Sequence, residues 1–167
     1  MKKTGIFYGS TTGTTEDIAG RIATRLGIGP SNVHTASELG SGLIASYEVL
    51  ILGSSTWGDG ELQDEWYDAI EVLKGADLSG KTVALFGCGD SSSYSDTFCD
   101  AMGIIFEAVK GRCTVIGQVS AEGYSFSSSK AVVDGKFVGL AIDEMNEDGK
   151  TDSRLDAWTE SLKGYLA

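Results

Sequence analysis

Four short apolar runs recur along the chain, and each is continuous rather than alternating with polar residues. They cover residues 5–8, 49–52, 82–86 and 114–116. Runs of this length, rich in Val, Ile, Leu and Phe, are typical of strands that are buried on both faces of a parallel sheet. A weaker run at residues 32–35 predicts a short edge strand.

Segments with helical spacing of apolar residues separate these runs. A spacing of three or four places successive apolar side chains on one face of a helix. The four sets are Ile18, Ile22 and Leu26; Leu62, Trp66, Ile70 and Leu73; Phe98, Met102, Ile105 and Val109; and Leu155, Trp158 and Leu162. Because strands and helices alternate, the sequence predicts a doubly wound α/β fold with right-handed crossovers. In such folds, ligands bind at the carboxyl ends of the strands.

The length and net charge of the chain exclude several classes of protein. The 167 residues fit one domain over residues 1–167. The 24 acidic and 13 basic side chains give a formal net charge of −11, which argues against nucleic acid or an anionic membrane as the main partner, since both require basic patches. No apolar stretch is long enough for a signal peptide or a membrane helix. We expect a monomeric, cytoplasmic protein whose partners have basic surfaces.

The cysteines and the single histidine do not form a pattern typical of a catalytic site or a metal-binding site. Cys88, Cys99 and Cys113 are odd in number and form no Cys-x-x-Cys pair, so neither a disulfide framework nor a zinc site is predicted. His34 lies on the predicted edge strand, away from the strand ends, and we expect it to be structural. No catalytic residues and no metal site are expected.

The first strong strand runs into a segment with five hydroxyl groups in six residues, Ser10-Thr11-Thr12-Gly13-Thr14-Thr15. This segment also begins a predicted helix, whose unpaired N–H groups and dipole favour an anion. Helix capping is the alternative, but one hydroxyl suffices for that. Neither a Walker A pattern nor a dinucleotide fingerprint is present. The pattern favours a phosphate on a ligand that stays bound and unreacted.

The next two strong strands end in polar loops that each contain an aromatic residue. Trp57 lies in Thr56-Trp57-Gly58-Asp59-Gly60, and Tyr94 follows Cys88-Gly89-Asp90. Two aromatic side chains beside a phosphate site could enclose a planar heterocycle. Taken singly, each could also be an ordinary, partly buried aromatic residue.

Together these segments resemble the three FMN-binding loops of flavodoxins, in order and over essentially the whole chain. We call them the first loop (residues 10–15), the second loop (residues 56–60) and the third loop (residues 87–99). The resemblance implies a five-stranded parallel sheet of order 2-1-3-4-5 with helices on both faces. Residues 118–136 resemble the insertion that splits the fifth strand in long-chain flavodoxins, with a hairpin turn at Asp134-Gly135.

The resemblance also implies roles for individual residues. Trp57 and Tyr94 would flank the isoalloxazine ring. Asp90 would accept a hydrogen bond from the flavin N3–H, with the Gly89 and Cys99 amides near the pyrimidine oxygens. The phosphate would be bound by Ser10, Thr11, Thr12, Gly13, Thr14 and Thr15. The other expected cofactor-binding residues are Ser55, Thr56, Gly58, Asp59, Gly60, Cys88 and Phe98.

The implied function is that of a low-potential one-electron carrier with non-covalent FMN, not an enzyme, cycling mainly between semiquinone and hydroquinone. Its partners would be basic-faced redox proteins such as a flavodoxin/ferredoxin reductase and other oxidoreductases. The Gly58-Asp59 peptide would reorient on reduction, which glycine permits. Seven acids around the last two loops would disfavour an anionic reduced flavin and steer basic partners. They are Asp59, Glu61, Asp64, Glu65, Asp90, Asp96 and Asp100.

Two alternative functional hypotheses are compatible with the expected fold. An FMN-dependent NAD(P)H:quinone reductase would be an enzyme, but no residues remain to form a nicotinamide or quinone pocket. A response-regulator receiver domain carries a phosphorylated Asp near the position of Asp59. It also requires two acids after the first strand and a Lys after the fifth, whereas here Ser and Thr follow the first strand and residues 114–118 contain no Lys.

Overall fold

The computed structural model describes residues 1–167, and seven of its strands form one sheet. The main path runs β2-β1-β3-β5-β10, and all its neighbouring strands are parallel. These strands are β1 (Thr4–Gly9), β2 (Val33–Thr35), β3 (Val49–Trp57), β5 (Thr82–Cys88) and β10 (Leu140–Ile142). The predicted doubly wound parallel order is confirmed.

Two short strands share the fifth position of the sheet. β6 (Thr114–Ile116) pairs with the beginning of β5, and β10 pairs with its end. Between them, a small antiparallel sheet is built from β7 (Val119–Ser120), β9 (Lys136–Phe137) and β8 (Val132–Val133). The hairpin turn at Asp134-Gly135 is confirmed, with φ of 53° and 80° at its two residues. The assignment of this segment to the long-chain insertion stays a prediction.

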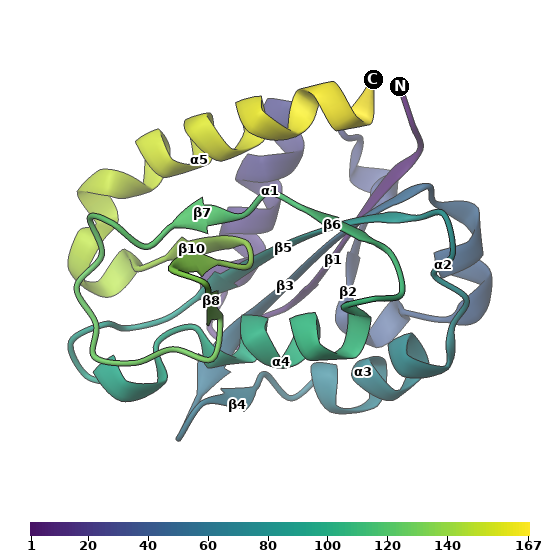
Figure 1. The fold of residues 1–167 in the computed structure, drawn as a ribbon. Coiled ribbons are helices and arrows are strands. Elements are labelled where there is room, and N and C mark those ends of the chain that lie inside the picture. The colour runs from purple at the N-terminus through teal and green to yellow at the C-terminus, as the bar shows by residue number, and fades with distance from the viewer.

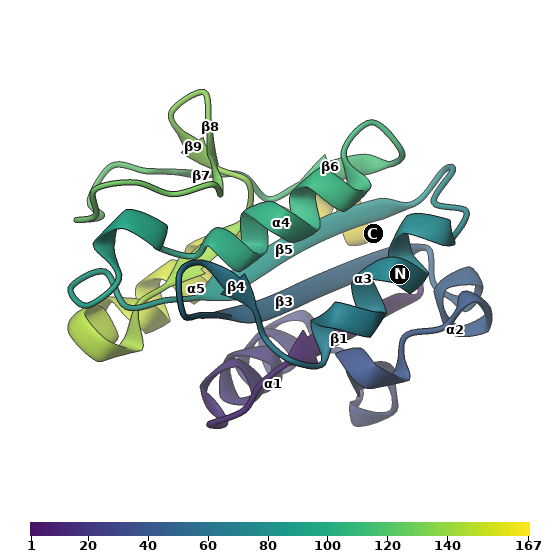
Figure 2. The ribbon, with the colours of Figure 1, turned by 90° about the horizontal axis from the view of Figure 1, so that it is seen from below.

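Helices cover both faces of the sheet (Figure 1). α1 (Thr14–Leu26) and α5 (Glu144–Leu166) lie on one face, and α3 (Trp66–Gly75) and α4 (Asp100–Val109) lie on the other, nearest the viewer in Figure 2. The remaining short helices are α2 (Ser41–Ser46), η1 (Pro30–Asn32), η2 (Ala36–Glu38) and η3 (Ser95–Thr97). The two chain ends meet, where the Lys2 N–H donates to the Leu166 carbonyl at 2.8 Å.

The sheet separates two hydrophobic cores, which explains why its central strands contain continuous apolar runs. In β3, Leu50 and Leu52 pack toward α3 and α4, whereas Val49 and Ile51 pack toward α1 and α5. Successive side chains of a strand point to opposite faces, so a strand covered on both sides has no polar face. All four of these side chains are fully buried.

Two residues assigned to helices by their spacing lie outside them. Leu62 belongs to the short strand β4 (Glu61–Leu62), which pairs with the end of β3. Phe98 precedes α4 and packs against Phe126 and Phe137, with ring centroids 5.6 and 5.9 Å apart. Both side chains are buried at a helical distance from the next apolar residue, so periodicity alone did not separate them from the helices.

Two arginines of α1 connect this helix to α5. Arg21 lies 3.0 Å from Glu144, and Arg25 lies 2.7 Å from Asp156. Such partly exposed ion pairs contribute about 0–1 kcal/mol each. They hold the beginning of α5 beside the helix that follows the first loop.

Gly139 packs so closely against β5 that a Cβ atom there would overlap the Leu85 carbonyl oxygen. We expect Gly139→Ala to destabilise the fold by about 1–3 kcal/mol, since a backbone atom cannot move aside as a side chain can. Gly20→Ala in α1 is the matched control, with nothing within 4 Å of its Cβ. It should stabilise the fold by about 0.5–1 kcal/mol. Urea unfolding measures both, and equal stability of the two variants would contradict the packing described.

Candidate functional site

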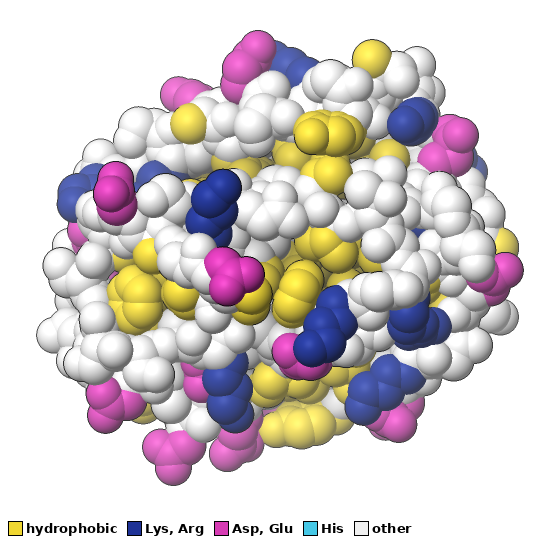
Figure 3. Space-filling view, viewed as in Figure 1, with side chains coloured by type: hydrophobic (Ala, Val, Ile, Leu, Met, Phe, Trp, Pro, Cys, Tyr) yellow, Lys and Arg dark blue, Asp and Glu magenta, His cyan; other side chains and the backbone are white.

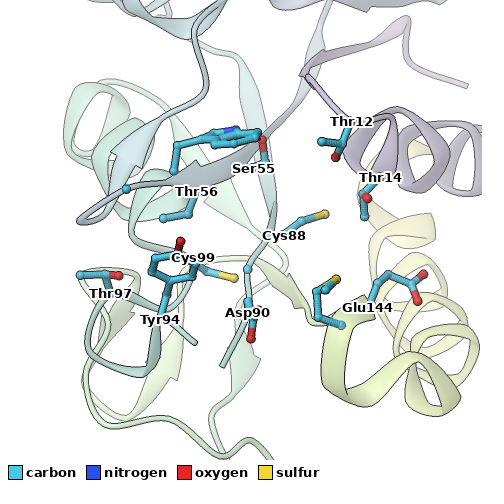
Figure 4. A pocket seen from close by; sticks show the side chains of 14 residues that line it. Thr12, Thr14, Ser55, Thr56, Cys88, Asp90, Tyr94, Thr97, Cys99 and Glu144 are labelled. Atoms are coloured by element: carbon cyan, nitrogen blue, oxygen red, sulfur yellow. The ribbon is translucent and has the colours of Figure 1, made fainter. Parts of the chain in front are cut away.

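A cavity lies at the carboxyl ends of β3 and β5, beside the beginnings of α1 and α5 (Figure 4). Its volume is about 200 Å³. Parts of all three predicted loops line it, including Thr97 of the third loop, which was not among the expected site residues, together with Glu144 and Met145, which lie outside the predicted loops. The expected residues in the lining are Thr12, Thr14, Ser55, Thr56, Trp57, Gly58, Cys88, Gly89, Asp90, Tyr94 and Cys99.

The other expected residues lie outside this lining. Thr15 is fully buried in the first turn of α1, and Ser10 accepts a hydrogen bond from the Gly13 N–H at 3.1 Å. Phe98 is fully buried in an aromatic cluster beneath the third loop. The full set is Ser10, Thr11, Gly13, Thr15, Asp59, Gly60 and Phe98.

The N-terminus of α1 has the properties of an anion site. Gly13 precedes the helix with φ of 93°, a left-handed conformation that glycine adopts at little cost. No side chain caps the helix, so capping does not account for the hydroxyl groups of the first loop. The first N–H groups of a helix have no partners within it. The Thr15 hydroxyl is also buried without a hydrogen-bond partner, and a ligand oxygen would satisfy it.

The two aromatic residues of the loops are unusually exposed for their size. Trp57 is 42% exposed and Tyr94 is 50% exposed, and both line the cavity. The Trp57 Nε1–H donates to Ser55 Oγ at 2.9 Å, which holds the indole in place. Figure 4 shows Tyr94 across the cavity from Thr12 and Thr14. A ligand with a planar ring and an anionic group would cover the aromatic surfaces and reach the helix N-terminus.

Asp90 is held as a carboxylate by the third loop and α5. Its Oδ1 accepts hydrogen bonds from the Ser92 N–H at 3.1 Å, the Ser93 N–H at 3.0 Å and the Asn146 amide at 2.8 Å. These donors, Ser93 foremost, hold the pKa of Asp90 below its ordinary value. Oδ2 has no partner within the protein. One oxygen therefore organises the loop, and the other can accept a hydrogen bond from a ligand.

Asp143 connects α5 to the third loop. This fully buried residue caps the helix by accepting from the Asn146 N–H at 3.1 Å. Its other oxygen accepts from the Ser91 N–H at 3.3 Å and from the Ser91 hydroxyl. The cap places Glu144 and Met145 at the cavity. An Asp before a helix is a sequence signal for an N-terminus, but the apolar spacing that marked this helix begins only at Leu155.

The two cysteines of the lining are buried. Burial raises the pKa of Cys88 to about 12 and that of Cys99 well above its ordinary value. Both thiols are therefore protonated at neutral pH, and both are free. No cluster of three or more His, Cys, Asp and Glu side chains is arranged to hold a metal ion. No helix has the length and apolar character needed to span a bilayer.

Asp100 differs from the other acids near the loops, because it is only 2% exposed. Its Oδ1 accepts from the Lys130 N–H at 2.7 Å, and burial raises its pKa. The sequence-based placement of Asp100 in an acidic surface around the loops is therefore wrong. Asp59, Glu61, Asp64 and Asp96 are exposed.

The sequence model of the flavodoxin family matches residues 6–158. Flavodoxin 1 of Escherichia coli K12 is 42% identical over 168 residues, covering 99% of this chain and 96% of that protein. The chain is a member of the flavodoxin family. Flavodoxins are electron-transfer proteins that use FMN, not substrate-converting enzymes.

Two further relatives support the flavodoxin assignment over the whole chain. A Nostoc sp. flavodoxin is 42% identical over 163 residues, covering 97% of this chain and 96% of that protein. The crystal structure of Fusobacterium nucleatum flavodoxin bound to flavin mononucleotide is 30% identical, with a TM-score of 0.90 and full coverage of both chains. Neither the quinone reductase nor the receiver domain is favoured by these matches.

Proposed function

We propose that this flavodoxin is a low-potential one-electron carrier that binds FMN non-covalently in the cavity at the carboxyl end of the sheet. One observation carries the proposal. The uncapped N-terminus of α1, with Thr12 and Thr14 in the cavity lining, opens beside the half-exposed rings of Trp57 and Tyr94. FMN, when bound, supplies the one-electron chemistry, and the chain binds, orients and shields it.

Different residues bind different parts of the cofactor. The first loop and the first turn of α1 hold the phosphate. Trp57 and Tyr94 cover the two faces of the ring, and Asp90 Oδ2 accepts from the flavin N3–H. Gly58, which is exposed and has φ of 50°, lets the second loop change its backbone orientation beside the ring at little steric cost.

The charges near the second loop should lower the potential of the second one-electron reduction. Residues 55–73 contain no Lys or Arg, and Asp59, Glu61 and Asp64 are exposed there. These carboxylates disfavour an additional negative charge on the flavin. In potentiometry, we expect this second potential to lie below that of free FMN. A value equal to or above that of free FMN would contradict the electrostatic argument.

The proposed partners are basic-faced redox proteins, such as a flavodoxin/ferredoxin reductase and other oxidoreductases. The face in Figure 3 carries Lys and Arg interspersed with Asp and Glu, whereas the second loop and the segment after it, through residue 73, carry only acids. Opposite charge raises the rate of encounter, and salt screens it. Three free thiols fit a reducing compartment, and we place this monomeric carrier in the cytoplasm.

Mixing the FMN-loaded protein with NAD(P)H distinguishes a carrier from a reductase. A carrier keeps its flavin oxidised under anaerobic conditions until a catalytic amount of a separate flavodoxin reductase is added. The visible flavin absorbance reports the reduction. Rapid loss of the flavin absorbance with NAD(P)H alone would contradict the proposal and support the quinone reductase hypothesis.

A further inference from the structure

Gln63 is a buried amide that connects the first loop to the segment after the second loop. The residue is 2% exposed and lies between β4 and α3. Its backbone N–H donates to Ser54 Oγ at 3.2 Å, its Oε1 accepts from the Glu65 N–H at 2.9 Å, and its Nε2 donates to Thr11 Oγ1 at 3.1 Å. Buried polar side chains that use all their groups fix their neighbours in one arrangement.

The orientation of this amide is set by its surroundings. The Glu65 N–H can only donate, so the atom that faces it must be the amide oxygen, and the amide nitrogen must face Thr11. Gly9 makes room for the group, because a Cβ atom at Gly9 would lie 2.3 Å from Gln63 Oε1. The end of β1 and the turn before α3 therefore hold the amide in one orientation.

This orientation determines what the Thr11 hydroxyl can do. A hydroxyl has one hydrogen to donate, and its oxygen can accept. Since Thr11 Oγ1 already accepts from Gln63, its own hydrogen remains free for an acceptor outside the protein. A donor whose oxygen accepts a hydrogen bond is also polarised toward stronger donation.

We propose that Gln63 is a positioning residue for the phosphate of the flavin, acting through the Thr11 hydroxyl. The proposal rests on the proposed function, because it requires a phosphate at the first loop. It assigns to a residue outside the cavity lining a part in distinguishing a phosphorylated flavin from riboflavin. A role in folding alone would affect both ligands equally.

The test compares the dissociation constants of the apoprotein for FMN and riboflavin, measured by flavin fluorescence quenching. Gln63→Met keeps the length of the side chain and removes the donor. We expect it to weaken FMN binding roughly threefold to tenfold, the value of one hydrogen bond, and to leave riboflavin binding unchanged. Thr11→Val should weaken FMN binding selectively as well. In the Thr11→Val background, Gln63→Met should have little further effect, because both act through one hydroxyl.

Tyr47→Phe provides a loss of partly buried hydrogen bonds away from the first loop. The Tyr47 hydroxyl donates to Asn32 at 3.0 Å and lies 2.7 Å from His34 Nε2. Its removal should lower the thermal midpoint without changing the ratio of the two dissociation constants. If Gln63→Met does not fold, Gln63→Glu retains the shape and the acceptor for the Glu65 N–H, and the same selective loss is expected.

Two results would overturn the inference while leaving the function in place. One is an equal loss of FMN and riboflavin binding in the Gln63 variant. The other is full additivity of the Gln63 and Thr11 substitutions. If the parent protein binds FMN no better than riboflavin, the phosphate site itself is wrong, and both proposals fail.

Discussion

Replacing Thr12 and Thr14 together by valine should weaken FMN binding at least a hundredfold and leave riboflavin binding nearly unchanged. Both residues line the cavity at the N-terminus of α1. A hydrogen bond to a charged group contributes about 1.5–3 kcal/mol, so two of them correspond to roughly 10²–10⁴ in the dissociation constant. Valine has the shape of threonine, so the expected loss comes from the hydroxyl groups. Titration of the apoprotein with each flavin measures it.

Thr24→Val is the control on the same helix. The Thr24 hydroxyl is exposed and donates to the Gly20 carbonyl at 3.0 Å, within α1 and outside the cavity. This variant should bind both flavins as the parent does. A loss of riboflavin affinity as large as that of FMN in the double variant would show that the first loop does not hold the phosphate.

Substitution of Trp57 should not discriminate between the two flavins. We expect Trp57→Leu to weaken the binding of FMN and riboflavin alike, by about tenfold to a hundredfold. Aromatic pairing contributes about 0.5–1.5 kcal/mol beyond apolar burial, and the smaller side chain also covers less of the ring. The same fluorescence titration measures the effect. Because Trp57 is 42% exposed, its replacement should leave the unfolding free energy nearly unchanged.

Tyr67→Leu tests whether the loss of any exposed aromatic residue near the loops weakens flavin binding. Tyr67 is 49% exposed, donates to Glu61 at 3.1 Å and does not line the cavity. This variant should bind both flavins with the parent's affinity. Unchanged binding in Trp57→Leu, or an equal loss in Tyr67→Leu, would contradict the assignment of Trp57 to the ring.

The fold was predictable because its strands are covered on both sides. The first part of β3, residues 49–52, with Leu50 facing one core and Ile51 the other, is a continuous apolar run that differs plainly from the helices around it. The order of the sheet came from the resemblance. Leu62 and Phe98 were assigned wrongly because burial just before a helix produces the same spacing as burial within it.

The parts of the site contributed by one chain segment were predictable, and those that depend on distant contacts were not. Five hydroxyls in the first loop are visible in the sequence. The burial of Asp100 depends on Lys130, thirty positions away. The bond from Gln63 to Thr11 spans fifty-two positions. No local pattern marks such contacts, because the sheet brings these segments together.

The most direct test of the central claim is a titration of the apoprotein with FMN, followed by flavin fluorescence. The account predicts quenching that reaches an end point at one FMN per chain, because the ring lies between Trp57 and Tyr94. It also predicts weaker binding of riboflavin, because the first loop holds the phosphate. Absence of quenching, or equal affinity for the two flavins, would contradict the proposed site.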